Sequence, residues 1–211
     1  MRWIKTHSLV KKIFKNYTWE IPNNENKIYL TFDDGTTPET TNWILSELKK
    51  YNAKATFFCT GDNVKKYPAV FEKVIDDGHS IGNHSFNHLN GWKTKTNNYV
   101  SNVEACLAEF EKFKNYTNQP KIFRPPYGKI TPLQSKYLRR LGYKIILWDI
   151  ISYDFDKSTS KEKCLQNVIQ NSRSGSIIVF HDSQKAFENL KYVLPKVLYF
   201  LSQNQFAFEK L

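Results

Sequence analysis

Residues 27–35 read KIYLTFDDG, an apolar and β-branched run that ends in two acids and a glycine. The run Lys27 to Phe32 predicts a β-strand. Asp33 and Asp34 follow at its carboxyl end, where Gly35 begins a turn. Side chains of neighbouring residues in an extended segment point to opposite sides, so one acid can bind a metal while the other faces a substrate. The alternative is an ordinary Asp-Gly turn in which an acid serves only as a cap.

Outward from this strand, short apolar runs alternate with longer segments of helical periodicity. The alternation predicts an α/β fold with helices packed over a parallel sheet, either an open doubly wound sheet or a barrel. The predicted strands are Lys27 to Phe32, Ala55 to Phe58, Ser80 to Gly82, Ile122 to Phe123, Tyr143 to Trp148, Ser176 to Phe180 and Phe206 to Phe208. The predicted helices are Pro38 to Tyr51, Pro68 to Asp77, Tyr99 to Phe113, Pro132 to Leu141, Lys161 to Asn171 and Gln184 to Ser202.

A second polar cluster, His84-Ser85-Phe86-Asn87-His88, follows the short predicted strand Ser80 to Gly82. Two imidazoles four residues apart on a helical turn lie on one face and can bind the same ion. With a carboxylate from another segment they form a His-His-Asp set that leaves coordination positions open, as catalytic metal sites do. Two unrelated surface histidines are the alternative. We expect the nearby His79 to be packed and hydrogen-bonded.

A third cluster is Phe123-Arg124-Pro125-Pro126-Tyr127-Gly128. The two prolines fix the backbone, so the Arg124 side chain and the Tyr127 amide have preset directions. A rigid N–H can act as an oxyanion donor, and an arginine can hold a neighbouring carboxylate ionised. As an isolated string, this segment would be only a stiff loop.

The fourth cluster is the apolar strand Ile177 to Phe180, which ends in His181. A histidine at a strand end beside a metal can serve as a general acid, because its ordinary pKa is near neutrality. A histidine in such a place can also be purely structural.

Composition narrows the function classes. The chain has 31 Lys and Arg against 20 Asp and Glu, a formal charge of +11. This charge attracts polyanions, but the basic residues are scattered and no nucleic-acid-binding motif is present, so we expect no specific nucleic-acid binding. An anionic membrane or cell-wall polymer would be attracted equally well. The three cysteines, Cys59, Cys106 and Cys164, are too widely spaced for a metal motif and are expected to be free thiols, which suits a reducing compartment.

The N-terminal residues 1–26 form a basic segment ahead of the domain expected at residues 27–211. Val10, Ile13, Phe14 and Tyr17 recur at helical spacing with lysines on the other faces. Two interpretations compete: a helix packed on the domain, which we favour, or a segment that lies on an anionic membrane surface. Neither a signal peptide nor a membrane-spanning run is apparent, so we expect a cytoplasmic or peripherally membrane-associated protein, and a monomer.

The four clusters, in this order and with residues Trp148 to Phe155 between the last two, resemble the polysaccharide deacetylases of carbohydrate esterase family 4, the NodB homology domain. The resemblance covers Lys27 to Leu211. It implies a distorted (β/α) barrel with fewer units than the full eight. It also implies a metal-dependent hydrolase that removes N-acetyl groups from N-acetylglucosamine-containing chitin- or peptidoglycan-type polymers or oligomers and releases acetate.

The resemblance also implies a role for each matching residue. Asp33 matches the general base and His181 the general acid, while Arg124 matches the arginine that positions the base and Tyr127 the backbone donor to the oxyanion. The implied metal ligands are Asp34, His84 and His88. The positions expected at the substrate are Pro126, Tyr127, Trp148, Asp154, Phe155 and Val179. Two histidines and one carboxylate favour zinc, with cobalt, nickel or manganese as other divalent candidates.

One segment departs from the family pattern. Relatives commonly carry an acid, two residues, a second acid and a tryptophan, whereas this chain has Ile151 and Phe155 at the first and last of these positions. The first acid orients the catalytic histidine in many relatives, and an isoleucine cannot do so. Asp149 or Asp154 could replace it as the partner of His181, with a shifted histidine pKa and an altered sugar preference.

Two other interpretations remain open at this stage. The same metal set could cleave a different bond, as in an O-acetyl esterase on xylan or a deformylase of a lipid-linked sugar. The fold could also serve as a non-catalytic carbohydrate-binding module. Base and ligand positions should be eroded in such a module, yet all five of Asp33, Asp34, His84, His88 and His181 are present.

Overall fold

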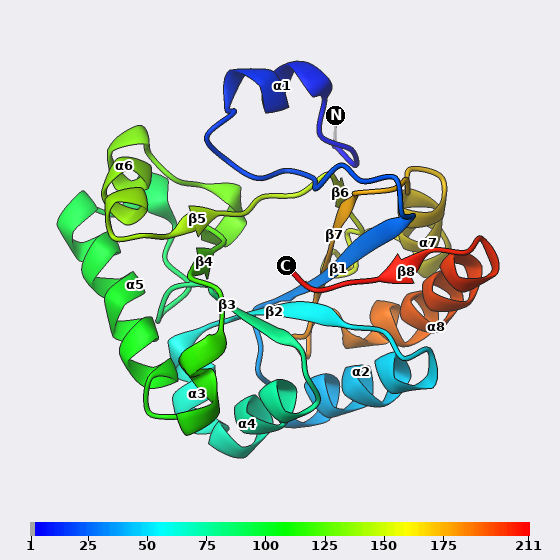
Figure 1. Cartoon of the computed structure of the whole chain (residues 1–211), viewed down its shortest axis with the longest axis horizontal. Helices are drawn as coiled ribbons and strands as arrows, with labels where there is room; N and C mark the ends of the chain where they lie inside the picture. Colours follow the sequence, from blue (N-terminus) through cyan, green and yellow to red (C-terminus); the bar gives the residue numbers. More distant parts are fainter. Residues whose placement is uncertain (1–2) are drawn as a thin grey trace.

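A parallel sheet curls around the centre of the molecule in the computed structural model, which describes residues 3–211. The strand order is β5-β4-β3-β2-β1-β7-β6, with the short β8 paired beside the start of β1. Helices form an outer ring around this sheet (Figure 1). The fold is therefore the predicted distorted (β/α) barrel. The strands are β1 (Lys27–Asp33), β2 (Ala55–Cys59), β3 (Ser80–Asn83), β4 (Ile122–Phe123), β5 (Lys144–Ile145), β6 (Ile150–Ile151), β7 (Ile177–His181) and β8 (Ala207–Phe208).

The helices cover the sheet with their apolar stripes. Helix α2 buries Ile44 and Leu48 against the central strands, and Pro38 occupies its first turn as predicted. The α-helices are α1 (Ser8–Ile13), α2 (Pro38–Lys50), α3 (Gly61–Lys66), α4 (Pro68–Asp76), α5 (Thr96–Phe110), α6 (Pro132–Arg140), α7 (Lys161–Ile169) and α8 (Phe187–Gln203). Three short 3₁₀ turns are η1 (Gly91–Lys93), η2 (Lys114–Asn118) and η3 (Pro126–Gly128).

The core lies between the central strands and the surrounding helices. Phe32, Phe57 and Phe180 stack across neighbouring strands β1, β2 and β7. Their burial on both faces of the sheet explains why these strands are continuous apolar runs. The three cysteines are buried free thiols, as predicted. His79 is also buried, where its Nδ1 accepts a hydrogen bond from the Ala55 amide at 3.2 Å.

The predicted strand over Tyr143 to Trp148 is present only in part: β5 covers Lys144–Ile145, and β6 (Ile150–Ile151) begins after the predicted segment. These two short strands are the ends of the strand order in the curled sheet. Trp148 and Asp149 lie between them outside any strand, and composition alone could not reveal this break because the residues on both sides are apolar.

The N-terminal arm, residues 3–21, closes the seam between these edges. The Ile151 amide donates to the carbonyl of Ile4 at 3.0 Å, and on the other side the Leu147 amide donates to the carbonyl of Thr18 at 2.7 Å. Between these contacts, α1 stands at the outside of the ring between α6 and α7 (Figure 1). None of the six α1 residues is buried. The flanks of the arm are thus fixed to the barrel while its helix stays exposed.

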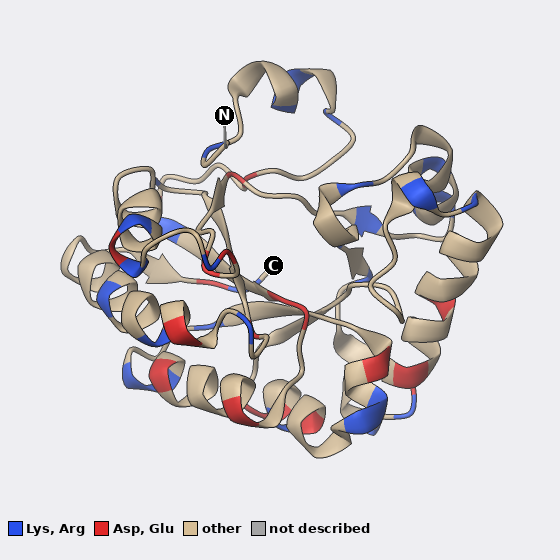
Figure 2. Ribbon diagram, turned by 180° about the vertical axis from the view of Figure 1, so that it is seen from behind, with Lys and Arg blue, Asp and Glu red and all other residues tan. Residues whose placement is uncertain are grey.

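Positive charge is spread over the surface. Lys and Arg occur on most outer helices and on the N-terminal arm, with Asp and Glu interspersed among them (Figure 2). Among residues 3–211, no helix combines the length and apolar character needed to cross a membrane.

Candidate active site

The polar clusters meet at the carboxyl ends of β1, β3 and β7. Strands β1 and β7 pair in parallel with Asp33 opposite His181, so the two predicted catalytic side chains leave the sheet side by side. In barrels of alternating strands and helices, this end of the sheet carries the reactive residues. Parallel pairing therefore brings together residues that are about 150 positions apart in the sequence.

Asp33 is held by a buried arginine. The Arg124 side chain is fully buried, and its Nη1 donates to Asp33 Oδ1 and to Thr31 Oγ1, both at 2.7 Å. Its Nη2 donates to the carbonyl of Leu147 at 3.0 Å, and the guanidinium lies over the Phe58 ring at 4.1 Å. The rigid, fully buried guanidinium therefore fixes the direction of the Asp33 carboxylate.

Asp34 points away from Asp33 and meets two imidazoles. Its Oδ1 lies 3.1 Å from His88 Nε2 and 3.6 Å from His84 Nε2. Within residues 3–211, these three residues are the group that could hold a metal ion, with ligand atoms within 4.8 Å of one another. Ligand atoms at tetrahedral positions around a zinc ion are separated by about 3.4 Å, so the set fits a small divalent cation.

Both imidazoles are oriented by partners outside this set. His84 Nδ1 donates to the carbonyl of Arg124 at 2.7 Å, and His88 Nδ1 pairs with the Tyr127 hydroxyl at 3.1 Å. Each contact occupies Nδ1 and leaves Nε2 toward Asp34. Such partners fix the tautomer and ring orientation of metal-ligating histidines.

The protonation states also suit a metal. Burial lowers the pKa of His84 to about 4, which keeps this ring neutral and able to ligate. Burial alone would raise the pKa of Asp34, but a hydrogen bond from His88 and the nearby His181 and His84 lower it well below its usual range. At neutral pH the set therefore offers the anionic Asp34 carboxylate and the neutral His84 ring, with His88 Nε2 beside them.

The predicted helical turn at His84 to His88 is absent. This segment is a loop in which Ser85 and His88 have left-handed backbone torsions, with φ of 61° and 54°. The Asn83 side chain accepts from the Ser85 amide and donates to the carbonyl of Val103, which fixes the start of the loop. The two rings still converge, with centroids 5.0 Å apart. The spacing of the two histidines thus correctly predicted that their rings converge, but a loop rather than a helical turn brings them together.

Asp154 replaces the acid that is missing at Ile151. Asp154 Oδ1 accepts from His181 Nδ1, and its Oδ2 accepts from the His181 amide, both at 2.8 Å. Burial lowers the pKa of His181, but the Asp154 carboxylate raises it to about 9. The other candidate, Asp149, instead lies beneath the N-terminal arm, where it accepts from Ser176 Oγ and pairs with Lys11.

Comparisons with known proteins agree with this geometry. The model of the family "Polysaccharide deacetylase" matches residues 20–146. The chain belongs to this family. A peptidoglycan-N-acetylglucosamine deacetylase of Bacillus cereus is 34% identical over 90% of this chain and 89% of its own length. The peptidoglycan-N-acetylmuramic acid deacetylase PdaA of Bacillus subtilis is 32% identical over 97% of this chain and 79% of its own length. The solved structure of the Bc1960 peptidoglycan N-acetylglucosamine deacetylase superposes with a TM-score of 0.87, at 31% identity, over 95% of this chain and 94% of that one.

In this family member, Asp33, Asp34, His84, His88 and His181 border a cavity of about 530 Å³. Aromatic side chains form much of its wall, and Ile151 reaches it from β6. Trp148, Phe155 and Val179, which were expected at the substrate, line this cavity. Tyr127 lines it too and has a left-handed backbone torsion, with φ of 60°, within η3. The predicted substrate contacts Pro126 and Asp154 do not belong to the described lining: Pro125 occupies the wall instead of Pro126, and Asp154 lies behind His181.

Four further residues lie in this cavity or next to its acidic turn. Lys129 and Lys185 line the cavity with Tyr153, although nothing in their local sequence marks them. Below them, the buried Asp182 accepts from the Gly35 amide at 2.7 Å and from Thr41 Oγ1 at 2.8 Å. Asp182 thereby ties β7 to the turn that carries Asp33 and Asp34.

Gly35 makes this tie sterically possible. A Cβ atom at this position would lie 1.8 Å from Asp182 Oδ2. We expect Gly35→Ala to lower the free energy of unfolding by about 1–3 kcal/mol and to reduce metal affinity, because the turn must shift. Urea denaturation with Ser202→Ala on the exposed end of α8 as a control measures the first effect. A Gly35→Ala protein with wild-type stability and metal affinity would contradict this assignment.

Proposed function

We propose that this family member is a metal-dependent hydrolase that removes N-acetyl groups from N-acetylglucosamine-containing polysaccharide or oligosaccharide of the peptidoglycan or chitin type. The observation that carries the proposal is the convergence of Asp33 with Arg124, of Asp34 with two histidines, and of His181 with Asp154 on one cavity. Relatives that match most of this chain are named as deacetylases of peptidoglycan and of chitooligosaccharide.

Asp34, His84 and His88 would hold the cation, for which zinc is our first candidate. Bound there, a divalent cation would lower the pKa of a water molecule and polarise the acetamide carbonyl. The solved Bc1960 structure contains 4-naphthalen-1-yl-N-oxidanyl-benzamide, an N-hydroxy amide. A ligand of this class is a useful probe of the site in this chain.

The chain's own residues would carry the proton transfers. Asp33, held in place by Arg124, accepts a proton from the water that attacks the acetamide carbon. The backbone N–H of Tyr127 donates to the oxyanion that forms as the carbonyl becomes tetrahedral. His181 then donates a proton to the sugar nitrogen as the C–N bond breaks, which yields acetate and a free amine. Asp154 holds the His181 ring so that Nε2 is the nitrogen that donates.

Aromatic and apolar residues would bind the sugar. Trp148, Tyr127 and Phe155 offer flat faces, and the buried Val179 provides an apolar contact for the acetyl methyl. Ile151 adds apolar surface where relatives carry an acid, which supports a sugar preference different from theirs. With these roles the chain is proposed to be catalytic. The alternative is a carbohydrate-binding module without turnover.

A substrate panel tests the proposal. We expect purified protein with zinc to release acetate and an equal amount of free amine from chitooligosaccharides or peptidoglycan. Acetylxylan is the discriminating substrate, because His181 could protonate the leaving oxygen of an ester as well as the leaving nitrogen of an amide. Acetate from acetylxylan alone would favour the esterase alternative, and binding without any release would favour the non-catalytic module.

The pH profile tests the His181–Asp154 pair. His181 must be protonated to act as an acid, and its pKa is raised to about 9, so activity should fall as the pH rises through about 9. Asp154→Asn removes the main influence that raises this pKa. The alkaline limb should then move to lower pH by at least about one unit, with a rate loss of about 10–100-fold at neutral pH.

Asp149→Asn is the matched control for this experiment, because Asp149 is the other carboxylate weighed for the role. Its substitution should leave the alkaline limb in place. If the alkaline limb shifted in Asp149→Asn but not in Asp154→Asn, the assignment of Asp154 as the partner of His181 would be contradicted.

A further inference from the structure

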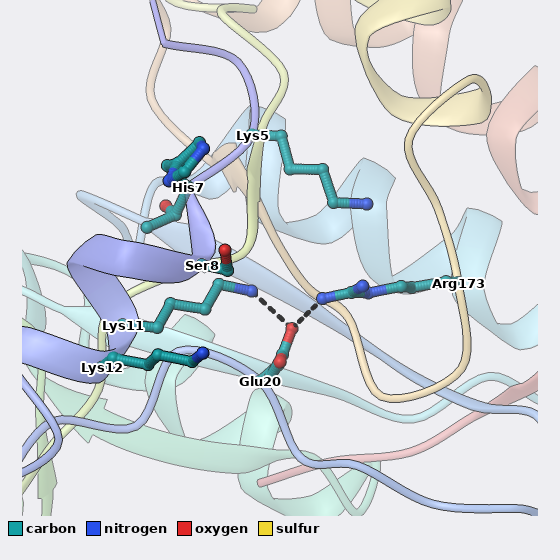
Figure 3. A pocket seen from close by; sticks show the side chains of 8 residues that line it. Lys5, His7, Ser8, Lys11, Lys12, Glu20 and Arg173 are labelled. Atoms are coloured by element: carbon teal, nitrogen blue, oxygen red, sulfur yellow. Dashed lines mark hydrogen bonds and ion pairs between the residues drawn. The ribbon is translucent and has the colours of Figure 1, made fainter.

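The exposed helix α1 lies beside a second cavity of about 510 Å³, far in sequence from the catalytic residues. Lysine and arginine side chains from the N-terminal arm and from the loop before β7 point into this cavity (Figure 3). We refer to it as the cation pocket. Its lining consists of Lys5, Thr6, His7, Ser8, Lys11, Lys12, Glu20 and Arg173.

The cation pocket carries more positive than negative side chains. Glu20 pairs with both Lys11 and Arg173, and the buried Asp149 pairs with Lys11 at 2.5 Å. Lys5 Nζ donates to the carbonyl of Asn171 at 2.8 Å and lies 3.9 Å from Asp149. Four cations thus face two carboxylates, and the excess positive charge favours an anionic group in the pocket.

Exposed apolar side chains also lie on α1 and at its carboxyl end. Leu9, Ile13 and Phe14 are 59%, 64% and 48% exposed. Leu9 and Ile13 lie on α1, none of whose residues is buried, and Phe14 is its C-cap residue. The segments on both sides of α1 are hydrogen-bonded to the barrel. Exposed lysines Lys12 and Lys15 flank them. Adjacent exposed apolar side chains of this size indicate an interaction site more often than chance exposure.

We propose that α1 and the cation pocket form a docking site for the surface of an anionic phospholipid bilayer. The pocket would receive a lipid phosphate, while Leu9, Ile13 and Phe14 enter the interface between headgroups and acyl chains. Charge complementarity supports this partner: residues 1–19 contain five basic residues and no acidic one. A soluble polyanion would satisfy the cations but would leave the three apolar side chains in water, and this difference favours the bilayer.

The N-terminal arm is fixed to the barrel by hydrogen bonds and ion pairs, so docking through α1 is compatible with activity. Lys11 pairs with Asp149, and this residue lies on the same short segment as Trp148 of the catalytic cavity. The arm also bonds to Ile151, which lines that cavity. Binding through α1 therefore does not require the arm to leave the seam that it closes. The proposal concerns where the protein binds and does not depend on which bond it cleaves.

Vesicle co-sedimentation tests the proposal with the full chain. We expect binding to vesicles of phosphatidylcholine with 30% phosphatidylglycerol, and at least about tenfold weaker binding to phosphatidylcholine alone. Leu9→Ser with Ile13→Ser should weaken binding to the anionic vesicles about tenfold or more. Lys5→Gln with Lys12→Gln should do the same and should also reduce the dependence of binding on salt.

A matched control comes from α6, where Leu133 is also exposed. Leu133→Ser with Lys136→Gln removes one apolar and one basic side chain from another surface helix and should leave vesicle binding unchanged. Acetate release from a soluble oligosaccharide should be the same in all of these variants, since none alters the catalytic cavity.

Other outcomes would overturn the proposal. Equal binding to neutral and anionic vesicles, or vesicle binding that Leu9→Ser with Ile13→Ser leaves unchanged, would show that α1 is not the docking element. Saturable binding of inorganic phosphate with no binding to vesicles would reassign the pocket to a free anion. A concentration-dependent dimer in sedimentation velocity that Leu9→Ser with Ile13→Ser abolishes would assign the apolar face to a second copy of this chain.

Discussion

Asp33→Asn should lower kcat/KM for acetate release by about 1000-fold, equivalent to about 4 kcal/mol of lost transition-state stabilisation. The asparagine keeps the shape of the side chain and can still accept a hydrogen bond from Arg124, but it cannot accept the proton of the attacking water. General-base catalysis commonly contributes a factor of this order. Initial rates measured at saturating metal give the effect directly.

Two further measurements separate catalysis from folding in this variant. Arg124 loses its charged partner, so the free energy of unfolding should fall by about 1–3 kcal/mol, which urea denaturation can measure. Metal affinity should change much less than turnover, because Asp34 rather than Asp33 belongs to the ligand set. Asp62→Asn, at an exposed ion pair with Lys66, serves as the control and should leave turnover unchanged. Wild-type turnover in Asp33→Asn would refute the role of Asp33.

His88→Ala should weaken zinc binding by about 100-fold or more and abolish turnover at micromolar zinc. Removing one of three protein ligands costs more than the 10–100-fold typical of removing a residue that only supports a ligand. The wild-type protein should become more resistant to thermal unfolding when zinc is added, because the ion binds only the folded chain. His88→Ala should lose most of this shift.

His7→Ala is the matched control, since His7 lies in the N-terminal arm and outside the Asp34, His84 and His88 set. Metal content after gel filtration provides a readout independent of activity. If His88→Ala retained one tightly bound zinc per chain, the ion would have to bind elsewhere.

Much of the fold could be predicted because buried parallel strands leave a clear sequence signal. The runs around Phe32, Phe57 and Phe180 are apolar on both faces, and the intervening helices carry amphipathic stripes. The seam of the barrel could not be predicted in this way. The arm closes it with hydrogen bonds at single residues such as Ile4 and Thr18, and isolated contacts of this kind produce no periodicity.

The site shows a similar division. Polar residues directly after strands were recognisable because parallel strands deliver their carboxyl ends to one edge. The loop from His84 to His88 depends on left-handed torsions and on side-chain oxygens of Asn83 and Asn102 that accept hydrogen bonds from its amides, which spacing does not encode. The choice between Asp149 and Asp154 required knowing which of them contacts His181: Asp154 accepts from its Nδ1, whereas Asp149 accepts from Ser176 Oγ. That information exists only in three dimensions.

The most direct test of the central claim is acetate release from an N-acetylglucosamine oligomer before chelation, after chelation and after zinc is restored. We predict equimolar acetate and free amine from the untreated protein, less than about 1% of that rate after chelation, and recovery with about one equivalent of zinc per chain. Acetate release that survives complete removal of metal, or a fully metal-loaded protein that releases no acetate from any N-acetylated sugar, would contradict the claim.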